Sequence, residues 1–262
     1  PPAALRIWAR YAGLPNGAAV ERGPVHLPSS AYFGHVDPDG LTIWVDAGAP
    51  SPPHQPGHAH NGILGFVLDL GGIPFIVDRG VHGYDDSPFR TYCRSTHAHS
   101  TVTIDGGEQN ECWGTFRVGR RARVLRAAAR EAPGGGWQFT SACRPYGDRE
   151  RLHIRRFRLE GSRLLISDRV LGCTGAPYVS YLQLHPSVNI EFEAEGILVR
   201  RGSTSLRIVP VGFDSWRIAA GEQQPQLGWH FPDFGTAVPA PTLAGAGTAG
   251  RSRSGFVIEA LS

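Results

Sequence analysis

The chain has 262 residues, a length that allows one large domain or two modest ones with a sizeable core. Its 41% hydrophobic and 19% charged residues are typical of a folded globular protein, and no apolar run approaches the roughly 18 residues that a membrane span requires. The net charge of +3, carried by arginines without a single lysine, is too small to indicate nucleic-acid binding.

The N-terminal segment predicts the end of a helix. Residues 3–13 place four apolar side chains on one helical face, and Gly13 follows as a stop. Residues 14–30 are rich in Gly and Pro and predict a linker. The chain starts at Pro1, has no methionine and shows no secretion signal. We therefore expect a fragment or a processed piece, with residues 1–30 as the end of an upstream helical domain and 31–262 as one β-domain.

From about residue 31 the pattern changes to short strands separated by Gly, Pro and Asp. Gly-Gly at 71–72 and Glu-Gly-Ser at 160–162 predict hairpin turns. Residues 240–254 are of low complexity and predict a loop. Numerous strands with few helical periods favour an all-β fold, a large antiparallel β-sandwich with a short N-terminal helix left from an upstream domain. The expected strands cover residues 41–48, 63–70, 73–78, 100–106, 151–172, 178–192, 196–211 and 255–261.

Residues that can carry chemistry concentrate between positions 54 and 117. On a strand, the pair His58 and His60 would present both imidazoles on one side, because side chains alternate. A second apolar strand ends in Asp78, and His97 and His99 precede a third strand. Two imidazoles and one carboxylate, arriving from three strands, suit a three-ligand zinc site.

Two other interpretations of these residues stay open. The histidines can be polar loop and edge residues, or they can serve acid–base chemistry without a metal. A hairpin at Gly71-Gly72 also sets Asp78 opposite Gly65, which leaves His60 about 16 Å further along a straight strand. A metal site therefore requires the chain to bend near Gly62 or Gly65.

The motifs occur in a recognisable order. A His-x-His precedes an apolar strand, a strand ending in Asp-x-Gly follows, and an Arg-x-Tyr-x-Arg-Ser-Thr run leads to Ala-His and a strand ending in Asp-Gly. This order resembles the C-terminal domain of the heparinase II/III-like family over roughly residues 31–235. The later segments HIRRFRLEGSRLLISDRVLG and LQLHPSVNI resemble it too. The matching residues are His58, His60, Asp78, Gly80, Tyr84, Arg90, Tyr92, Arg94, Ser95, Thr96, His99, Thr101, Val102, Asp105 and Gly106.

The resemblance implies a polysaccharide lyase that cleaves uronate-containing chains, such as glycosaminoglycans or alginate, by β-elimination. It implies zinc as the cofactor, with His60, Asp78 and His99 as its ligands. It also implies catalytic roles for His58, as a base or carboxylate partner, and for Tyr84, as an acid–base or substrate-contacting hydroxyl.

Three further residues are candidates for substrate binding. Arg90 and Arg94 can bind uronate carboxylates or can buttress their loop by hydrogen bonds. His97 can touch substrate and competes with His99 for the metal, and His99 is preferred because it occupies the Ala-His position of the family.

The resemblance also implies partners and a location. It implies an acidic polysaccharide as substrate and an upstream helical toroid domain that completes the cleft. From the charge and the lack of a long apolar run we expect no nucleic-acid partner and no membrane span. We expect a periplasmic or secreted bacterial protein, and we expect this chain alone to bind zinc but to show little lyase activity. The sequence departs from the family pattern at three positions beside the expected ligands, Gly62, Gly65 and Ser100.

The sequence is also compatible with functions other than a lyase, to different degrees. A cupin-type metal site would need a Glu about four residues after the His-x-His, where this chain has Leu64 and Gly65. A degenerate lyase in exopolysaccharide assembly stays possible, as does a non-catalytic carbohydrate-binding module. The aromatic residues that such a module could use for stacking are Trp113, Phe116, Trp137, Trp216 and Trp229.

Overall fold

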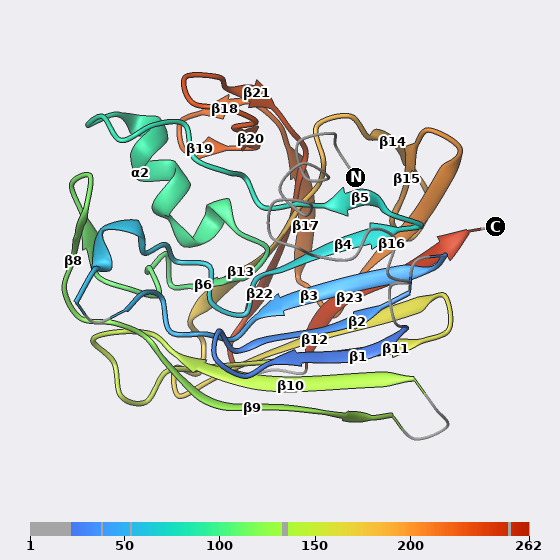
Figure 1. Ribbon diagram of the computed structural model, residues 1–262, viewed down its shortest axis with the longest axis horizontal. Coiled ribbons are helices and arrows are strands. Elements are labelled where there is room, and N and C mark those ends of the chain that lie inside the picture. The colour runs from blue at the N-terminus through green and yellow to red at the C-terminus, as the bar shows by residue number, and fades with distance from the viewer. Residues whose placement is uncertain (1–21, 38, 53, 133–135, 251–252, 262) are drawn as a thin grey trace, which may run out of the picture.

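The computed structural model describes residues 22–37, 39–52, 54–132, 136–250 and 253–261 (Figure 1). The helix expected at residues 3–13 lies outside these ranges. The described chain is mostly strand, and its sheets are antiparallel, which confirms the expected all-β class. None of the helices in this part of the chain has the length and apolar character needed to cross a membrane.

Three sheets make up the body of the molecule (Figure 1). The five-stranded sheet contains, in spatial order, β1 (Gly23–Leu27), β2 (Tyr32–Val36), β3 (Leu41–Asp46), β4 (Phe66–Leu70) and β5 (Ile73–Ile76). The eight-stranded sheet contains β14 (Asn189–Phe192), β15 (Ile197–Arg201), β16 (Thr204–Val211), β23 (Ser254–Leu261), β12 (Arg163–Leu171), β11 (Leu152–Glu160), β10 (Trp137–Arg144) and β9 (Arg123–Glu131). The four-stranded sheet contains β17 (Ser215–Ala219), β22 (Thr242–Thr248), β13 (Pro177–Gln183) and β6 (Val102–Ile104).

Short elements decorate one end of the sheets. The helical ones are η1 (Pro56–His58), α2 (Pro88–Arg94) and η2 (Thr96–Ala98). Three two-residue ladders pair β7 (Cys112–Trp113) with β8 (Arg117–Val118), β18 (Glu222–Gln223) with β19 (Gln226–Leu227), and β20 (Trp229–His230) with β21 (Val238–Pro239).

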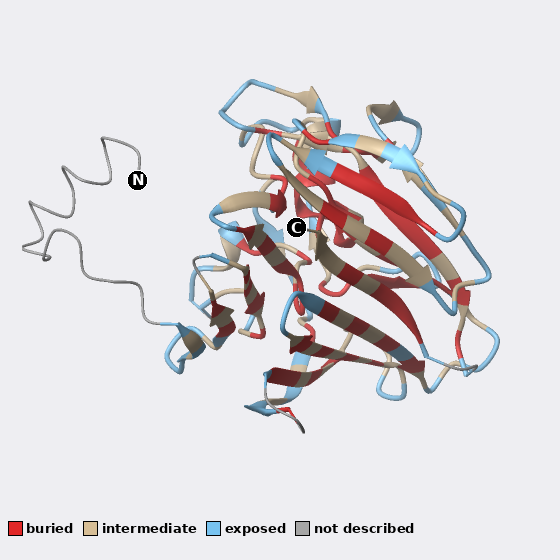
Figure 2. Ribbon diagram, turned by 90° about the vertical axis from the view of Figure 1, so that its right-hand side faces the viewer, coloured by how far each residue is buried: buried red, intermediate tan, exposed pale blue. Residues whose placement is uncertain are grey.

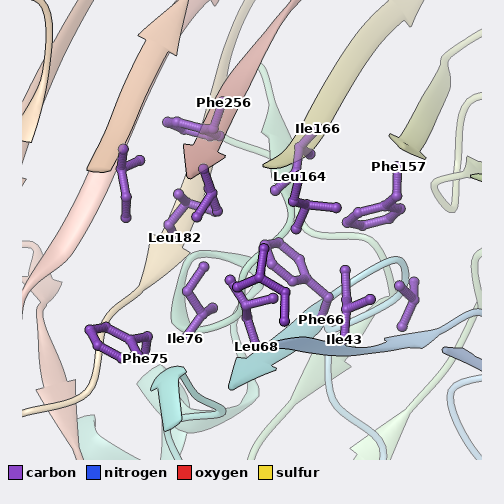
Figure 3. Close-up of a cluster of buried hydrophobic side chains, with 14 of the residues drawn as sticks. Ile43, Phe66, Leu68, Phe75, Ile76, Phe157, Leu164, Ile166, Leu182 and Phe256 are labelled. Atoms are coloured by element: carbon purple, nitrogen blue, oxygen red, sulfur yellow. The ribbon is translucent and has the colours of Figure 1, made fainter. Parts of the chain in front are cut away.

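The main core lies between the five-stranded and eight-stranded sheets. Alternate residues of β3 and β12 are buried, as expected for strands with one face toward a core (Figure 2). Figure 3 shows side chains from β3 and β4 meeting those from β11 and β12, and Phe66 packs edge-on against Phe157 with ring centroids 5.2 Å apart. This packing makes the two sheets a sandwich.

The expected hairpins are confirmed. Leu70 pairs with Ile73 around Gly71 and Gly72, whose φ angles of 57° and 74° suit a turn that needs two left-handed residues. Glu160 pairs with Arg163 in the same way.

Two segments expected to be irregular form strands. β1 lies within the expected linker and pairs with β2, so the sandwich begins before residue 31. The loop expected at 240–254 was wrong, because β22 runs between β17 and β13. A Cβ at Gly245 or Gly247 would lie 2.6 Å from a ring atom of Phe213 or Tyr178, so the small residues of this strand serve close packing rather than disorder.

The helix α2 was not expected. Ser87 caps it by accepting a hydrogen bond from the backbone N–H of Arg90 at 3.2 Å, and Pro88 occupies the first turn. The Ser-Pro pair is a helix-start signal that could have revealed this helix.

Candidate functional site

A sharp bend precedes β4. The backbone N–H of Gly65 donates to the carbonyl of Gly62 at 2.8 Å, and Leu64 has a φ of 62°. A Cβ on Gly65 would lie 2.7 Å from the Gly62 carbonyl oxygen, so this turn requires glycine. The bend that the site needs therefore occurs where the sequence analysis required it, and the straight-strand geometry does not apply.

His58 and His60 lie on the irregular segment before this bend. His58 ends η1, Ala59 is extended, and His60 lies outside any helix or strand, so the expected strand for the His-x-His pair was wrong. Asn61 anchors the segment, since its backbone and side-chain N–H groups both donate to the Arg94 carbonyl, at 3.1 and 2.7 Å. Both histidines nevertheless line the same cavity.

Asp78 follows β5, the strand that pairs with β4, and its side chain lines the same cavity. Its Oδ1 accepts the backbone N–H of Gly80 at 3.0 Å, which sets the orientation of the carboxylate. Its side chain is 55% exposed, and Oδ2 is directed to His99. A carboxylate placed this way is accessible to a ligand.

His99 follows η2 and is buried. Its Nδ1 lies 2.8 Å from Asp78 Oδ2, and its ring centroid lies 5.5 Å from that of His60. The ring packs over Gly62, where a Cβ would approach His99 Cγ to 3.2 Å. A larger residue at position 62 would press on the imidazole, which gives a structural reason for the glycine there.

The electrostatics of the three residues differ. Burial, followed by the charge of His99, lowers the pKa of His60 to about 4, so its imidazole is neutral at neutral pH. For His99, burial opposes the charged form, but the Asp78 carboxylate prevails and raises the pKa. Burial alone would raise the pKa of Asp78, but the charge and the hydrogen bond of His99 hold this pKa below its usual range.

These side chains suit a zinc ion in their chemistry, although they do not surround one. Among the described residues, no three His, Cys, Asp or Glu side chains are gathered closely enough to form a metal centre as they stand. However, Nε2 of His99 is buried without a hydrogen-bond partner, and His60 offers a neutral nitrogen beside it. His60, Asp78 and His99 are the residues that would hold such an ion, and it would supply positive charge at this end of the cavity.

The four residues His58, His60, Asp78 and His99 line one cavity of about 310 Å³. Tyr84 does not line this cavity, but its hydroxyl lies 3.5 Å from Nδ1 of His58, which does. The sequence-predicted catalytic pair is thus together, next to the predicted ligands.

Arg90 and Arg94 are buried in α2 and do not line the cavity. Arg90 donates to the carbonyl of Thr115 at 2.7 Å and to that of Gly57 at 3.4 Å. Arg94 donates to the carbonyl of Gly114 at 2.7 Å and to that of Ala59 at 3.3 Å. Of the two roles considered, these contacts favour bracing of the segment that carries His58 and His60.

His97 does not share the cavity of His99. It lines a separate cavity, together with Tyr181, and its ring packs against Tyr92 with centroids 5.4 Å apart. The cavity that holds His58, His60, Asp78 and His99 does not include it.

Arg79 was missed by the sequence analysis. It is 1% exposed, and its guanidinium donates to the Gln183 side chain, the carbonyls of Leu184 and Pro241, and the Thr242 hydroxyl, each at 2.7 Å. Gln183 in turn donates to the carbonyl of His99 at 3.2 Å. Arg79, the residue after Asp78, is therefore connected to the backbone of His99 through the buried side-chain amide of Gln183.

A second buried network supports the same loops. Arg155 and Asp168 are fully buried, with Nε to Oδ1 at 2.7 Å and Nη2 to Oδ2 at 2.8 Å. Nη1 of Arg155 donates to the carbonyls of Leu64 and Ser100, at 3.1 and 2.5 Å. The ring Nε2 of His153 lies at hydrogen-bond distance, 2.8 Å, from Oδ1 of Asp168.

The cavity also contains residues that the sequence analysis did not single out, among them Tyr32, Trp44 and Asp46. Burial, opposed by the Gly48 N–H and His99, raises the pKa of Asp46. Asp46 closes an apolar strand just as Asp78 does, and that shared pattern is the signal that could have identified it.

Comparisons with known proteins agree with this fold. Residues 19–255 match the family described as Heparinase II/III-like, C-terminal. Heparan sulfate lyase HepC from Pedobacter heparinus superposes with a TM-score of 0.72 and 18% identity, over 99% of this chain and 41% of that one. A structure of heparinase III, the BT4657 gene product, gives a TM-score of 0.70 and 16% identity, over 99% and 39%.

The chain thus spans about two fifths of the length of these solved lyases. No curated protein matches the chain in sequence. Because the family match covers residues 19–255, most of the chain, the chain belongs to the heparinase II/III-like C-terminal family.

Proposed function

We propose that this chain is the zinc-binding C-terminal part of a lyase that cleaves uronate-containing polysaccharide by β-elimination. The observation that carries the proposal is the convergence of His58, His60, Asp78 and His99 on one cavity, with Tyr84 in reach of His58. The solved structures that share the fold include heparan sulfate lyases. The activity belongs to the whole lyase, which includes an upstream helical domain in this proposal.

The proposed roles are those that the family resemblance implies, and the proximity of Tyr84 to His58 supports them. His58 removes the proton at C5 of the uronate, and the electron pair of that bond forms the C4–C5 double bond as the C4–O bond breaks. Tyr84 returns a proton to the leaving oxygen. A bound zinc ion would supply charge stabilisation near the uronate carboxylate. Arg90 and Arg94 hold the His58 segment in place through backbone carbonyls.

The metal ligands are tested by metal analysis of purified chain. We expect about one zinc per chain in the wild type, and loss of most of it in His60→Ala, Asp78→Asn and His99→Ala. His97→Ala is the matched control, since His97 lies two residues from His99 but in another cavity, and it should keep its zinc. Equal zinc contents in the wild type and the ligand variants would contradict the proposed site.

The catalytic pair is tested by the ultraviolet absorbance of unsaturated uronate released from several acidic polysaccharides. In the full-length lyase, His58→Gln and Tyr84→Phe should each lower kcat by about 10²–10⁴-fold without removing the metal. Full activity in both variants would refute these roles.

A non-catalytic carbohydrate-binding function is a second candidate. Exposed aromatic rings surround Tyr84, namely Phe116 at 44% and Phe234 at 66% exposure, each with its centroid within 5.5 Å of the Tyr84 ring. Of the other aromatics considered for stacking, Trp113 is 47% exposed, whereas Trp137 is buried and Trp216 packs on the main core. Retained polysaccharide binding without any unsaturated product would favour this candidate.

Location follows from the substrate in this proposal. Large acidic polysaccharides lie outside the cytoplasm, so we infer a periplasmic or secreted protein. The cysteines Cys93, Cys112, Cys143 and Cys173 are free thiols in the structure. Fractionation of cells that express the full-length protein would test this location.

A further inference from the structure

The cavity of the proposed site continues beyond the histidines along the outer face of the five-stranded sheet. Along β3 the residues Leu41, Ile43 and Val45 face the core, so Trp44 and Asp46 face outward. Both of these line the same cavity as His99, as does Tyr32 from the neighbouring strand. The cavity therefore has a histidine end and an aromatic end.

The indole ring of Trp44 lies against the sheet at the aromatic end of the cavity. Trp44 pairs with Gly34 of β2 on one side and with Val67 of β4 on the other. A Cβ on Gly34 would lie only 2.9 Å from Cε3 and 3.1 Å from Cδ2 of the indole, so the ring rests directly over the glycine backbone. One face of the indole is thus supported by the sheet, and the ring is left half-buried beside the cavity.

Asp46 is fixed beside this ring. Its Oδ1 accepts the backbone N–H of Gly48 at 2.8 Å, and Oδ2 accepts no hydrogen bond from the described residues. Tyr32, which is 39% exposed, is its cross-strand partner. A pyranose ring has an apolar C–H face, which can stack on the indole of Trp44. Its hydroxyl groups are hydrogen-bond donors, which the Asp46 carboxylate can accept.

We propose that Trp44, Asp46 and Tyr32 form a subsite for a neutral sugar ring that adjoins the uronate, which makes the substrate a polymer of alternating uronate and uncharged hexose or N-acetylhexosamine. This inference rests on the proposed function, because it places the uronate at the histidine end. A second uronate at this position would bring its carboxylate against Asp46, and like charges at close range repel. A chain made only of uronates would therefore bind less well.

The test is calorimetric binding of two tetrasaccharides to the zinc-loaded chain. One alternates glucuronate with N-acetylglucosamine, and the other is a tetramer of mannuronate. We expect the wild type to bind the alternating ligand about tenfold more tightly, and Trp44→Ala to lose about tenfold of that affinity. Trp113→Ala is the matched control, because it removes an indole that is 47% exposed but lies outside the cavity. It should bind like the wild type.

A change in the preference between the two tetrasaccharides distinguishes a sugar subsite from a purely structural role of Trp44 and Asp46. Asp46→Asn keeps the shape of the side chain and removes its charge, so it should raise the affinity for the mannuronate tetramer while leaving the zinc content unchanged. Trp44→Phe should recover part of the affinity lost in Trp44→Ala. These two variants keep the test informative if Trp44→Ala does not fold.

The outcomes distinguish the two proposals. If the alternating tetrasaccharide binds and His58→Gln weakens it, but Trp44→Ala and Asp46→Asn bind both ligands like the wild type, the subsite is overturned and the proposed function stands. Preference of the wild type for the mannuronate tetramer would also overturn the subsite. If the wild-type chain binds neither tetrasaccharide, the subsite is overturned, while the proposed function is decided by the assay for unsaturated products on the full-length lyase.

Discussion

Gly80 holds the loop after Asp78 against the β20 segment. It bridges to Phe231, and the Phe231 N–H donates to the Arg79 carbonyl at 2.8 Å. Its φ of 76° lies in the left-handed region, and a Cβ there would be 2.4 Å from the Phe231 carbonyl oxygen. A single backbone position thus controls how the carboxylate of the candidate site is presented.

The substitution Gly80→Ala is expected to cost about 3 kcal/mol in the free energy of unfolding, because both the φ angle and the backbone contact are unfavourable for a side chain. Gly71→Ala is the control, since Gly71 has a φ of 57° but open space around its Cα, and it should cost about 1 kcal/mol. Urea unfolding monitored by circular dichroism measures both. Equal costs would show that the contact with Phe231 contributes nothing.

At the scale of elements, β11 and β12 support the site from the far side of the sandwich. Their buried Arg155 and Asp168 pair through two hydrogen bonds, and Ser180 of β13 donates to Asp168 at 2.8 Å. The remaining nitrogen of Arg155 reaches the carbonyls of Leu64 and Ser100. Three strands and two loops are thereby joined at one buried ion pair.

Asp168→Asn is expected to destabilise the protein by about 3–5 kcal/mol, because it leaves the buried Arg155 charge without compensation. The exposed pair of Arg200 and Glu191, with an Nε–Oε1 distance of 3.1 Å and side chains 48% and 60% exposed, provides the control. Glu191→Gln should cost less than about 1 kcal/mol. Chemical denaturation distinguishes the two, and a small effect at Asp168 would contradict the role given to this network.

At the scale of the whole molecule, His185 lies where the sheets meet. Its backbone N–H donates to the carbonyl of Phe75 in β5 at 2.9 Å, and it lies between β13 and β14 of the other two sheets. Burial, followed by the charges of Arg201, His230 and Arg79, lowers the pKa of His185 to about 4. Protonation of this group is therefore linked to the stability of the assembled sandwich.

The sign of this linkage predicts acid sensitivity. The unfolded chain protonates His185 near its ordinary pKa of about 6.5, whereas the folded chain does so only near 4, so the unfolded state binds more protons in this window. The free energy of unfolding should be insensitive to His185 above about pH 6.5 and should fall as the pH drops from there toward 4. His185→Gln removes this contribution, so the difference between wild type and variant should change only within the window. An unchanged difference, measured by urea unfolding across that range, would rule out the linkage.

The strands and hairpins were predictable because they depend on residues close in sequence. Alternation along β3 and β12, and the glycines at 71–72, need only their neighbours to specify the local conformation. The same reasoning failed at β22, whose Ala and Gly residues look like a loop until the rings of Phe213 and Tyr178 are placed against them.

The amino-acid sequence alone was therefore sufficient to determine an all-β sandwich and to nominate His58, His60, Asp78, Tyr84 and His99. Only the tertiary structure decided that the four residues other than Tyr84 share a cavity, that Tyr84 lies next to His58, that His97 lines another cavity, and that Arg90 and Arg94 are buried braces. The physical reason is the range of the contacts involved. Arg155 reaches Leu64 across 91 positions of the chain, and Arg79 reaches Pro241 across 162, so no local pattern records them.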